Sequence, residues 1–298
     1  MREIDHPAGV REVDHPAPGG LDLEELEVEL ILEAICRVYG LDFRGYSRAS
    51  IRRRLRRRMG EEGAGSISGL QERVLHDAGC MSRLLQDLSV SDTEMFRDPR
   101  FFRAFREKVV PALRTYPFVR IWTAGCATGE ETYSLAIVLQ EEGLYERARV
   151  YATDMNERVL DRARAGEYPI TKMREYTRNY IAAGGTKALS AYYRADGTTA
   201  RFHPDLAGNV IFAQHNLVSD RSFNEFNAIL CRNVMIYFDR ALQEQVHGVL
   251  YESLAMFGVL GLGARESIRL TRYQPYYEEL DGREKLFRKV RWAHSGSS

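Results

Sequence analysis

One segment, Ile121–Glu131, decides much of the architecture, because it passes from a strand-like run through a glycine-containing turn into a helix start. After Phe118, short apolar runs rich in β-branched residues alternate with helical ones. This order predicts a parallel sheet whose crossovers are helices, and therefore an α/β domain. The expected strands span 118–123, 149–153, 210–213, 228–231 and 256–262, and the expected helices span 130–142, 156–165 and 240–254.

The stretch from Pro169 to Gly208 breaks this alternation and is rich in Tyr, Gly and Thr. Within it, the dipeptide Asp196-Gly197 is typical of a two-residue β-hairpin turn. We therefore expect a small inserted β-subdomain at about 169–208, inside a larger domain that spans 118–298.

The chain before this domain has a helical pattern. Apolar residues recur at helical spacing across 21–88, which predicts a small all-α N-terminal domain, followed by a linker and helix at 89–117. The first twenty residues contain a polar near-repeat, REIDHPA at 2–8 and REVDHPA at 11–17. A unit this short and polar cannot bury a face, so 1–20 is predicted to be a disordered tail.

Composition excludes several classes of protein. Of the 298 residues, 44% are apolar and 28% are charged, which is ordinary for a globular protein. The formal net charge is zero, so any electrostatic function must come from local clustering of charge. No apolar run approaches the roughly 20 residues that span a membrane. The four cysteines are scattered, which suggests neither a disulfide framework nor a metal site. We expect a cytoplasmic monomer without direct membrane insertion.

The turn after the first strand is a candidate cofactor site. Gly125 and Gly129 would let the backbone approach a ligand closely. Asp154 ends the next strand, where a carboxylate can accept hydrogen bonds from both ribose hydroxyl groups of an adenosine. Glu130 and Glu131 open the helix and would repel a pyrophosphate. They favour S-adenosylmethionine, which carries a sulfonium and an ammonium group and no phosphate. Alternatively, both glutamates merely complement the helix dipole.

Two asparagines mark further strand ends. Asn216 and Asn233 follow the strands that end near Ala213 and Cys231, and ligands of open α/β sheets bind outside such carboxyl ends. Their amide groups could bind adenine or the methionine part of the cofactor. Alternatively, the two residues cap helices, as Asn often does.

Several of these segments resemble one known family, the chemotaxis receptor methyltransferases of the CheR type. The resemblance covers about Leu26 to Phe287. It rests on the motifs Ile51–Met59, Ser91–Arg97, Ala124–Glu131, Ala152–Asp154, Asn216-Leu217 and Cys231–Phe238. It implies a seven-stranded, Rossmann-like S-adenosylmethionine methyltransferase domain with a small inserted β-subdomain, preceded by the all-α domain.

The resemblance also implies roles for individual residues. It places Ser91, Thr93 and Arg97 beside the cofactor from the linker side, and Tyr237 near the transferred methyl group. Arg97, Tyr237 and Arg114 are the candidate catalytic residues. The cofactor-binding candidates are Ser91, Thr93, Arg97, Gly125, Glu130, Glu131, Asp154, Asn216, Leu217, Asn233 and Val234. The sequence departs from the usual Gly-His-Ser-Glu of relatives at Gly263–Glu266, which reads Gly-Ala-Arg-Glu.

The implied reaction is methylation of glutamate side chains on a chemoreceptor or a similar helical signalling protein, with S-adenosylhomocysteine as the second product. The arginine-rich segment fits such an acidic substrate, and Arg53, Arg54, Arg57 and Arg58 are the substrate-binding candidates. Alternatively, these arginines form a solvated basic face. Nucleic acid is a less suitable partner, because no aromatic residues interleave with the arginines. A second functional alternative is a homologue that binds the cofactor and docks on a partner without turnover.

Overall fold

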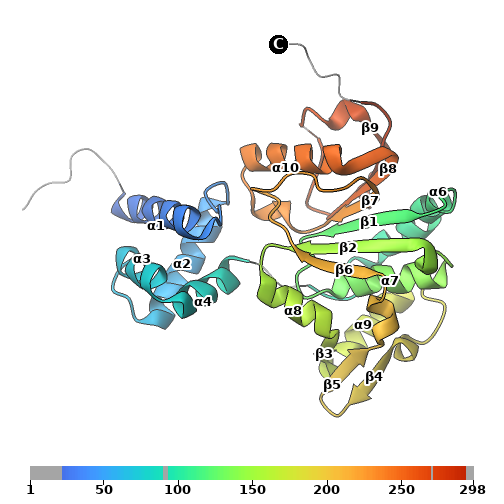
Figure 1. Cartoon of the computed structure of the whole chain (residues 1–298), viewed down its shortest axis with the longest axis horizontal. Helices are drawn as coiled ribbons and strands as arrows, with labels where there is room; N and C mark the ends of the chain where they lie inside the picture. The colour runs from blue at the N-terminus through green and yellow to red at the C-terminus, as the bar shows by residue number, and fades with distance from the viewer. Residues whose placement is uncertain (1–21, 90–92, 270, 293–298) are drawn as a thin grey trace, which may run out of the picture.

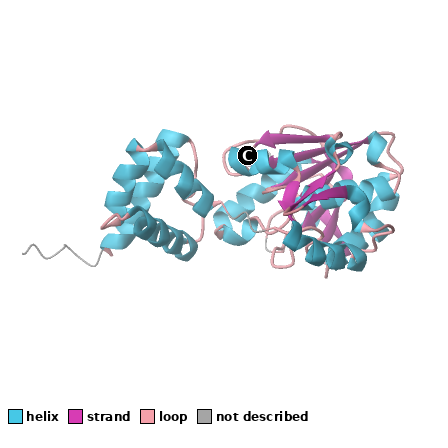
Figure 2. Cartoon of the chain, turned by 90° about the horizontal axis from the view of Figure 1, so that it is seen from below, coloured by secondary structure: helices cyan, strands magenta, loops and turns pink. Residues whose placement is uncertain are grey.

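The computed structural model describes residues 22–89, 93–269 and 271–292. The predicted disordered tail at 1–20 lies outside these residues. Figures 1 and 2 show a bundle of helices beside a larger body built on a sheet, which confirms the predicted fold class. In the described part of the chain, no helix is both long and apolar enough to span a bilayer.

Four helices form the N-terminal bundle: α1 (Leu23–Tyr39), α2 (Arg48–Glu62), α3 (Ile67–His76) and α4 (Ala78–Leu88). Short polar side chains begin three of them. Asp22, Ser66 and Asp77 accept hydrogen bonds from the first-turn amides of α1, α3 and α4. Gly40 ends α1 with a φ of 69°, a left-handed conformation that glycine adopts without steric cost.

The larger body contains a seven-stranded sheet in the order β6-β2-β1-β7-β8-β10-β9. The first five strands of this order are parallel to one another, and β10 and β9 are antiparallel additions. Their bounds are β1 Val119–Ala124, β2 Ala148–Asp154, β6 Val210–Gln214, β7 Phe226–Cys231, β8 Leu254–Leu262, β9 Tyr277–Asp281 and β10 Leu286–Lys289. The order reverses beside β1, between β2 and β7, which places a ligand crevice at the carboxyl ends of these strands.

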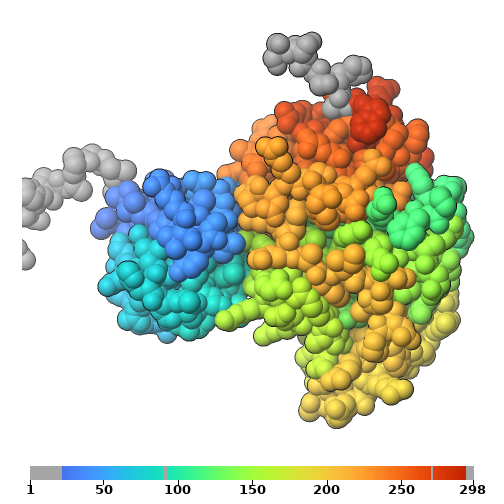
Figure 3. All heavy atoms as spheres, viewed as in Figure 1, coloured from blue at the N-terminus to red at the C-terminus, as the bar shows by residue number. Residues whose placement is uncertain are grey.

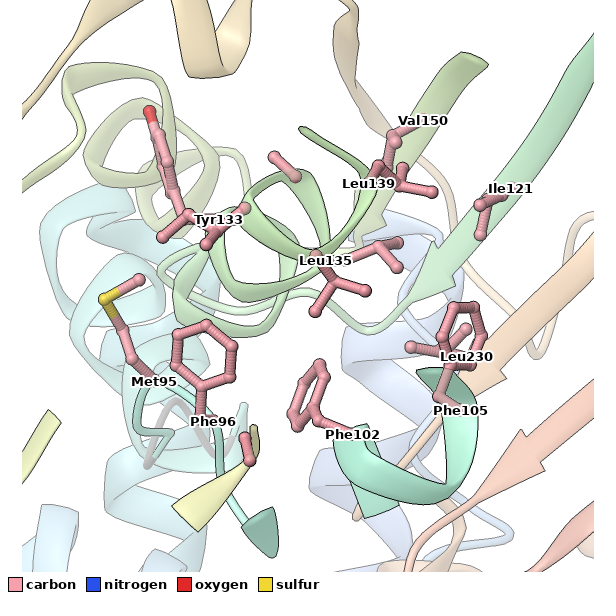
Figure 4. Close-up of a cluster of buried hydrophobic side chains, with 14 of the residues drawn as sticks. Met95, Phe96, Phe102, Phe105, Ile121, Tyr133, Leu135, Leu139, Val150 and Leu230 are labelled. Atoms are coloured by element: carbon pink, nitrogen blue, oxygen red, sulfur yellow. The ribbon is translucent and has the colours of Figure 1, made fainter. Parts of the chain in front are cut away.

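Helices cover both faces of this sheet. Successive residues of β1 point to opposite faces: Ile121 belongs to the cluster packed against α7 (Glu130–Glu141), whereas Trp122 belongs to the cluster that includes α10 (Arg240–Ser253). Figure 4 shows the first cluster, in which Phe102 and Phe105 pack between Leu135 of α7 and the strands. α8 (Glu157–Ala165) lies over β2 and β6.

The linker helix runs through α5 (Pro99–Ala104) and α6 (Val110–Leu113), with a π-helical turn at Phe105–Val109 between them. The inserted subdomain contains a second, three-stranded antiparallel sheet. Its strands are β3 (Glu167–Pro169), β4 (Tyr193–Asp196) and β5 (Thr199–Phe202), in the order β3-β5-β4. The predicted hairpin turn is present at Gly197, which has a φ of 55°. The subdomain also contains α9 (Met173–Ala182), a helix that we did not predict.

The helical bundle is anchored to the larger body near α10. The Ser47 amide donates to the Tyr237 carbonyl at 2.7 Å, and the Asp239 amide donates to the Gly45 carbonyl at 2.8 Å. Figure 3 shows the bundle packed against one side of the body, whereas the three-stranded subdomain protrudes away from it. The bundle therefore has a fixed position relative to the carboxyl ends of the parallel strands.

Candidate active site

A cavity lies where the carboxyl ends of β1, β2, β6 and β7 face the helical bundle. The cavity is lined by Tyr46, Leu88 and Ser89 from the bundle, Arg97 from the linker, and Gly125, Ala127, Asp154, Met155, His215, Asn216, Leu217, Val218, Arg232, Asn233, Val234, Tyr237 and Phe238 from the body. Eight of the residues predicted from the sequence are therefore brought together: Arg97, Gly125, Asp154, Asn216, Leu217, Asn233, Val234 and Tyr237.

Gly125 is at a point of close approach. Its φ is 72°, and a Cβ there would lie 2.5 Å from Cγ2 of Val234, so only glycine lets the turn after β1 reach the loop after β7. Gly129 has a different role from the one we expected. A Cβ at Gly129 would meet Ala163 of α8 at 2.9 Å, so this glycine allows packing against a helix and is absent from the cavity lining.

Asp154 is a buried carboxylate at the end of β2. Its oxygens accept the amides of Ala127 and Asn156, each at 3.0 Å. Burial raises its pKa, and these amide hydrogen bonds oppose that rise. The structure gives it no salt bridge to a cation within the described residues. Each oxygen has further acceptor capacity toward the cavity, which fits the two ribose hydroxyl groups of an adenosine.

Asn216 supplies an unused donor. Its Oδ1 accepts the Val218 amide at 3.0 Å, whereas its Nδ2 is buried and has no hydrogen-bond partner in the described part of the chain. A buried donor without a partner costs folding free energy unless a ligand accepts its hydrogen bond. Asn233 has a φ of 60°, a left-handed conformation that Asn tolerates better than most residues. The helix-cap alternative fails here, because neither asparagine caps a helix; Asp239 caps α10 instead.

The two glutamates at the start of α7 do not line the cavity. Glu130 is buried and accepts the Thr128 hydroxyl group at 2.7 Å, and burial raises its pKa to about 7. Glu131 pairs with Arg232 at 2.6 Å. The expected attraction of these carboxylates for the sulfonium therefore has no direct contact to support it in this arrangement.

Arg232 was part of a predicted motif, but we assigned it no role. Its side chain is almost fully buried and pairs with Glu131 and with Asp98 of the linker at 2.9 Å. It also donates to the Arg97 carbonyl at 3.1 Å and lies over the Phe101 ring at 4.0 Å. Arg232 thus joins the end of β7 to the linker that carries Arg97.

The helical bundle contributes directly to the site. Tyr46 lines the cavity and contacts the Phe238 ring at 4.8 Å, and the Arg54 guanidinium lies 5.2 Å from the centre of the Tyr237 ring. Sequence reasoning missed Tyr46 and Ser89, because a single aromatic residue in a turn and a serine after a helix carry no pattern. Met155 and His215 were also missed, although each adjoins a residue that we selected.

Most arginine side chains of α2 form salt bridges within the bundle, which corrects part of our interpretation of this helix as a substrate-binding surface. Arg58 is buried and pairs with Asp87 at 2.6 Å, so it cannot face outward to a substrate as predicted. Arg57 pairs with Glu61 but stays two-thirds exposed. Arg53 is exposed, and the structure gives it no salt bridge among the described residues. Three further arginines, Arg48, Arg52 and Arg56, pair with acidic residues of α1 or just before it. Arg54 donates to the Leu88 carbonyl instead.

The other predicted residues separate into three groups. Ser91 lies outside the described residues. Thr93 is half-buried in the linker and does not line the cavity. Arg114 was predicted to be catalytic, but the structure places it beyond α6, where it pairs with Glu142 at the far end of α7. Because α7 starts at the cavity side of the sheet, its far end and Arg114 lie at the opposite edge.

Comparison with known families decides the affiliation. Residues 26–89 match the all-alpha domain of the CheR methyltransferases, and residues 91–283 match their SAM-binding domain. The chain belongs to the CheR methyltransferase family. Its cofactor is S-adenosylmethionine. The buried Asp154 carboxylate fits an adenosine in this cavity, as does Nδ2 of Asn216, which has no partner among the described residues. The described residues contain no cluster suited to a metal ion.

Relatives within the CheR family align along most of this chain. A Pseudomonas putida protein named Cher3, provisionally assigned as a methyltransferase, is 47% identical over 89% of this chain and 97% of its own length. The chemotaxis protein methyltransferase of Salmonella typhimurium is 29% identical over 83% of this chain and 85% of its own. Among solved structures, the N-methyltransferase NodS of Bradyrhizobium japonicum, in complex with S-adenosyl-L-homocysteine, is 15% identical, with a TM-score of 0.33 over 57% of this chain and 63% of that chain.

Proposed function

We propose that this CheR-family methyltransferase esterifies glutamate side chains on a cytoplasmic, helical signalling protein such as a chemoreceptor. The observation that carries the proposal is the composite cavity, in which a cofactor site at the strand ends faces arginine and tyrosine side chains of the helical bundle and of the loop after β7. Related proteins named chemotaxis methyltransferases support the same substrate class.

The reaction requires little acid–base chemistry. A glutamate side chain has an unperturbed pKa of about 4.3, so it is already a nucleophilic carboxylate at neutral pH. S-adenosylmethionine supplies a methyl group on a positively charged sulfur, and attack by a carboxylate oxygen yields a methyl ester and S-adenosylhomocysteine. The protein therefore has to hold the two reactants in line, which can supply roughly 7–11 kcal/mol of the barrier.

The residues around the cavity have distinct parts in this positioning. Asp154 and Asn216 are suited to the adenosine. Tyr237 lies at the boundary with the helical bundle, where its hydroxyl group can donate to one oxygen of the substrate carboxylate while the other oxygen attacks. Arg97 approaches from the linker and can pair with the same carboxylate.

The exposed face of α2 is the candidate docking surface for the acidic substrate. After the correction above, Arg53 and Arg57 remain exposed, and Arg54 connects this face to Tyr237. An amphipathic helix rich in glutamate could contact these guanidinium groups and present one side chain to the cavity. The charge is smaller than the sequence suggested, because five of the arginines pair with acidic residues of the bundle and Arg54 is half-buried.

A homologue that binds the cofactor without turnover is the alternative, and formation of S-adenosylhomocysteine distinguishes the two. We expect multiple turnovers when a purified chemoreceptor cytoplasmic fragment is added to the chain with S-adenosylmethionine. A fragment whose methylated-region glutamates are changed to alanine is the matched control. Cofactor binding without S-adenosylhomocysteine formation on any receptor fragment would favour the regulatory alternative.

A further inference from the structure

A buried carboxylate outside the cavity controls the shape of the loop after β7. Glu266 follows β8 by four residues and is 5% exposed. Its Oε1 accepts the amides of Val234 and Met235, each at 2.8 Å. Its Oε2 accepts the amides of Asn233 at 2.9 Å and Gly263 at 2.6 Å.

Four backbone donors on one carboxylate make a nest of the kind that binds anions, here occupied by a side chain of the same molecule. The structure gives Glu266 no salt bridge to a cation within the described residues, so these amides are what compensates the buried charge. In exchange, the carboxylate holds three successive amides, those of Asn233, Val234 and Met235, on one side of the loop.

This arrangement has a direct consequence for the cavity. Asn233 and Val234 line it, and Met235 begins the 3₁₀ turn that carries Tyr237. Asn233 has the left-handed conformation, with a φ of 60°, which Asn adopts more readily than most residues. The hydrogen bonds from the amides of Asn233, Val234 and Met235 to Glu266 hold the loop in this conformation.

We propose that Glu266 is a positioning residue for methyl transfer, which acts by fixing the loop that presents Asn233, Val234 and Tyr237 to the cofactor and substrate. Glu266 touches neither reactant. The inference rests on the cavity being the cofactor site.

Two variants disturb the same contact by different means. Glu266→Gln keeps the shape but turns an NH2 group toward backbone donors, which cannot bond to it. Gly263→Ala keeps the carboxylate, but its Cβ would lie 2.7 Å from Oε2 of Glu266 and 2.8 Å from the Asn233 amide. Gly258→Ala is the matched control. Its Cβ would lie 2.9 Å from the Ala255 carbonyl and from the Leu254 side chain, within β8 and away from the contacts of Glu266.

The test measures S-adenosylhomocysteine affinity by calorimetry and kcat on a receptor fragment, at a temperature where circular dichroism shows each variant folded. We expect Glu266→Gln and Gly263→Ala to lower kcat by about 100-fold, as an error of about 1 Å in positioning can. Both should also weaken S-adenosylhomocysteine binding, whereas Gly258→Ala should lose stability and keep wild-type binding and kcat.

If Glu266→Gln does not fold, Gly263→Ala decides the question alone. A folded variant of either position with wild-type affinity and kcat would show that Glu266 has a purely structural role, and would overturn the inference. Wild-type protein that fails to bind S-adenosylhomocysteine would instead count against the cofactor site and the proposed function.

Discussion

At the scale of single residues, the cavity depends on polar side chains that follow the strands, such as the buried carboxylate of Asp154 and the buried Nδ2 group of Asn216. Asp154, Asn216 and Asn233 could be found because polar side chains at strand ends have a recognised meaning in α/β sheets. Tyr46, Ser89 and Arg232 could not, because their importance depends on which distant residues they meet. Glu130 shows the opposite error, since its helix-start position suggested a ligand contact, but its side chain turns to Thr128.

Asp154→Ala should weaken S-adenosylhomocysteine binding by about 1–3 kcal/mol, the scale of a lost charged hydrogen bond. The reason is that the buried carboxylate has free acceptor capacity at the cavity. Asp161→Ala is the control, because Asp161 is an exposed carboxylate of α8. Calorimetry that finds equal affinity for both variants would remove Asp154 from the ribose site.

Tyr237→Phe should lower kcat and leave S-adenosylhomocysteine affinity near wild type. Its hydroxyl group is proposed to serve the substrate carboxylate, while its ring keeps the contact with Arg54. Single-turnover kinetics on a receptor fragment checks this separation of binding from chemistry. A wild-type rate in the variant would leave the hydroxyl group without a role in the transfer.

Arg232→Met should destabilise the fold by about 3 kcal/mol, because it leaves Glu131 mostly buried without its partner and frees the linker at Asp98. Arg114→Met is the matched control. Its exposed pair with Glu142 should contribute no more than about 1 kcal/mol. Urea unfolding of the two variants measures the difference. Equal losses in the free energy of unfolding would mean that the buried pair contributes no more to stability than the exposed pair.

At the scale of elements, the helices and strands with a strong period were predicted closely, and those that lack one were not. The spans predicted for α7 and α10 each missed the end of the helix by one residue. β9 and β10 were not predicted because both strands are short and carry charged residues. α9 was not predicted, although Met173, Tyr176 and Tyr180 bury one face at helical spacing, because the stretch rich in Tyr, Gly and Thr was interpreted as a β-subdomain.

The charge of α2 was misjudged for a related reason. The sequence shows seven arginines close together, but it does not show that α1 presents carboxylates to the same helix. Salt bridges between elements depend on packing angle and register, which a local pattern cannot provide. The candidate substrate-binding surface is therefore limited to the side of α2 that bears Arg53 and Arg57 and adjoins Arg54.

Two buried groups should give opposite pH dependences of stability. Burial lowers the pKa of His247 in α10 to about 4, so the unfolded chain binds the extra proton between about pH 6.5 and 4, and stability is lost as pH falls through this window. Burial raises the pKa of Glu130 to about 7, so the folded chain binds the extra proton between about pH 4.5 and 7, and stability falls as pH rises there.

His247→Gln should therefore remove up to roughly 3 kcal/mol of the rise in the free energy of unfolding between pH 4 and 6.5. Glu130→Gln should make this rise steeper than in the wild type between pH 4.5 and 7. His76→Gln changes an exposed histidine and is the control. Denaturant titrations at several pH values check these signs, and parallel curves for all variants would contradict them.

At the scale of the whole molecule, the central feature is the docking of a helical bundle onto the open end of an α/β sheet. The backbone bonds between Ser47 and Tyr237 and between Gly45 and Asp239 fix the bundle over the cofactor cavity. The bundle consequently forms one wall of the cavity, and the strand ends of the body form the other. Such a division suits an enzyme that must match a small cofactor to a long protein substrate.

The exposed arginines of the bundle should act on substrate affinity alone. Changing both Arg53 and Arg57 to glutamine should raise KM for a receptor fragment and leave cofactor affinity unchanged. The increase should shrink with added salt, because exposed charges are screened beyond about 8 Å at physiological ionic strength. Arg56→Gln, an exposed arginine paired with Glu24, is the control. A KM that changes neither with the substitutions nor with the salt concentration would indicate that this face of α2 is only solvated and binds no substrate.

The chemical identity of the product tests the central claim most directly. A receptor cytoplasmic fragment is incubated with the chain and methyl-labelled S-adenosylmethionine, and its peptides are analysed by mass spectrometry before and after mild base. We predict methyl groups on glutamate side chains of the helical region, released as methanol by base, as expected for esters. Base-stable methyl groups on nitrogen, or label that enters nucleic acid and never the fragment, would contradict the proposed function.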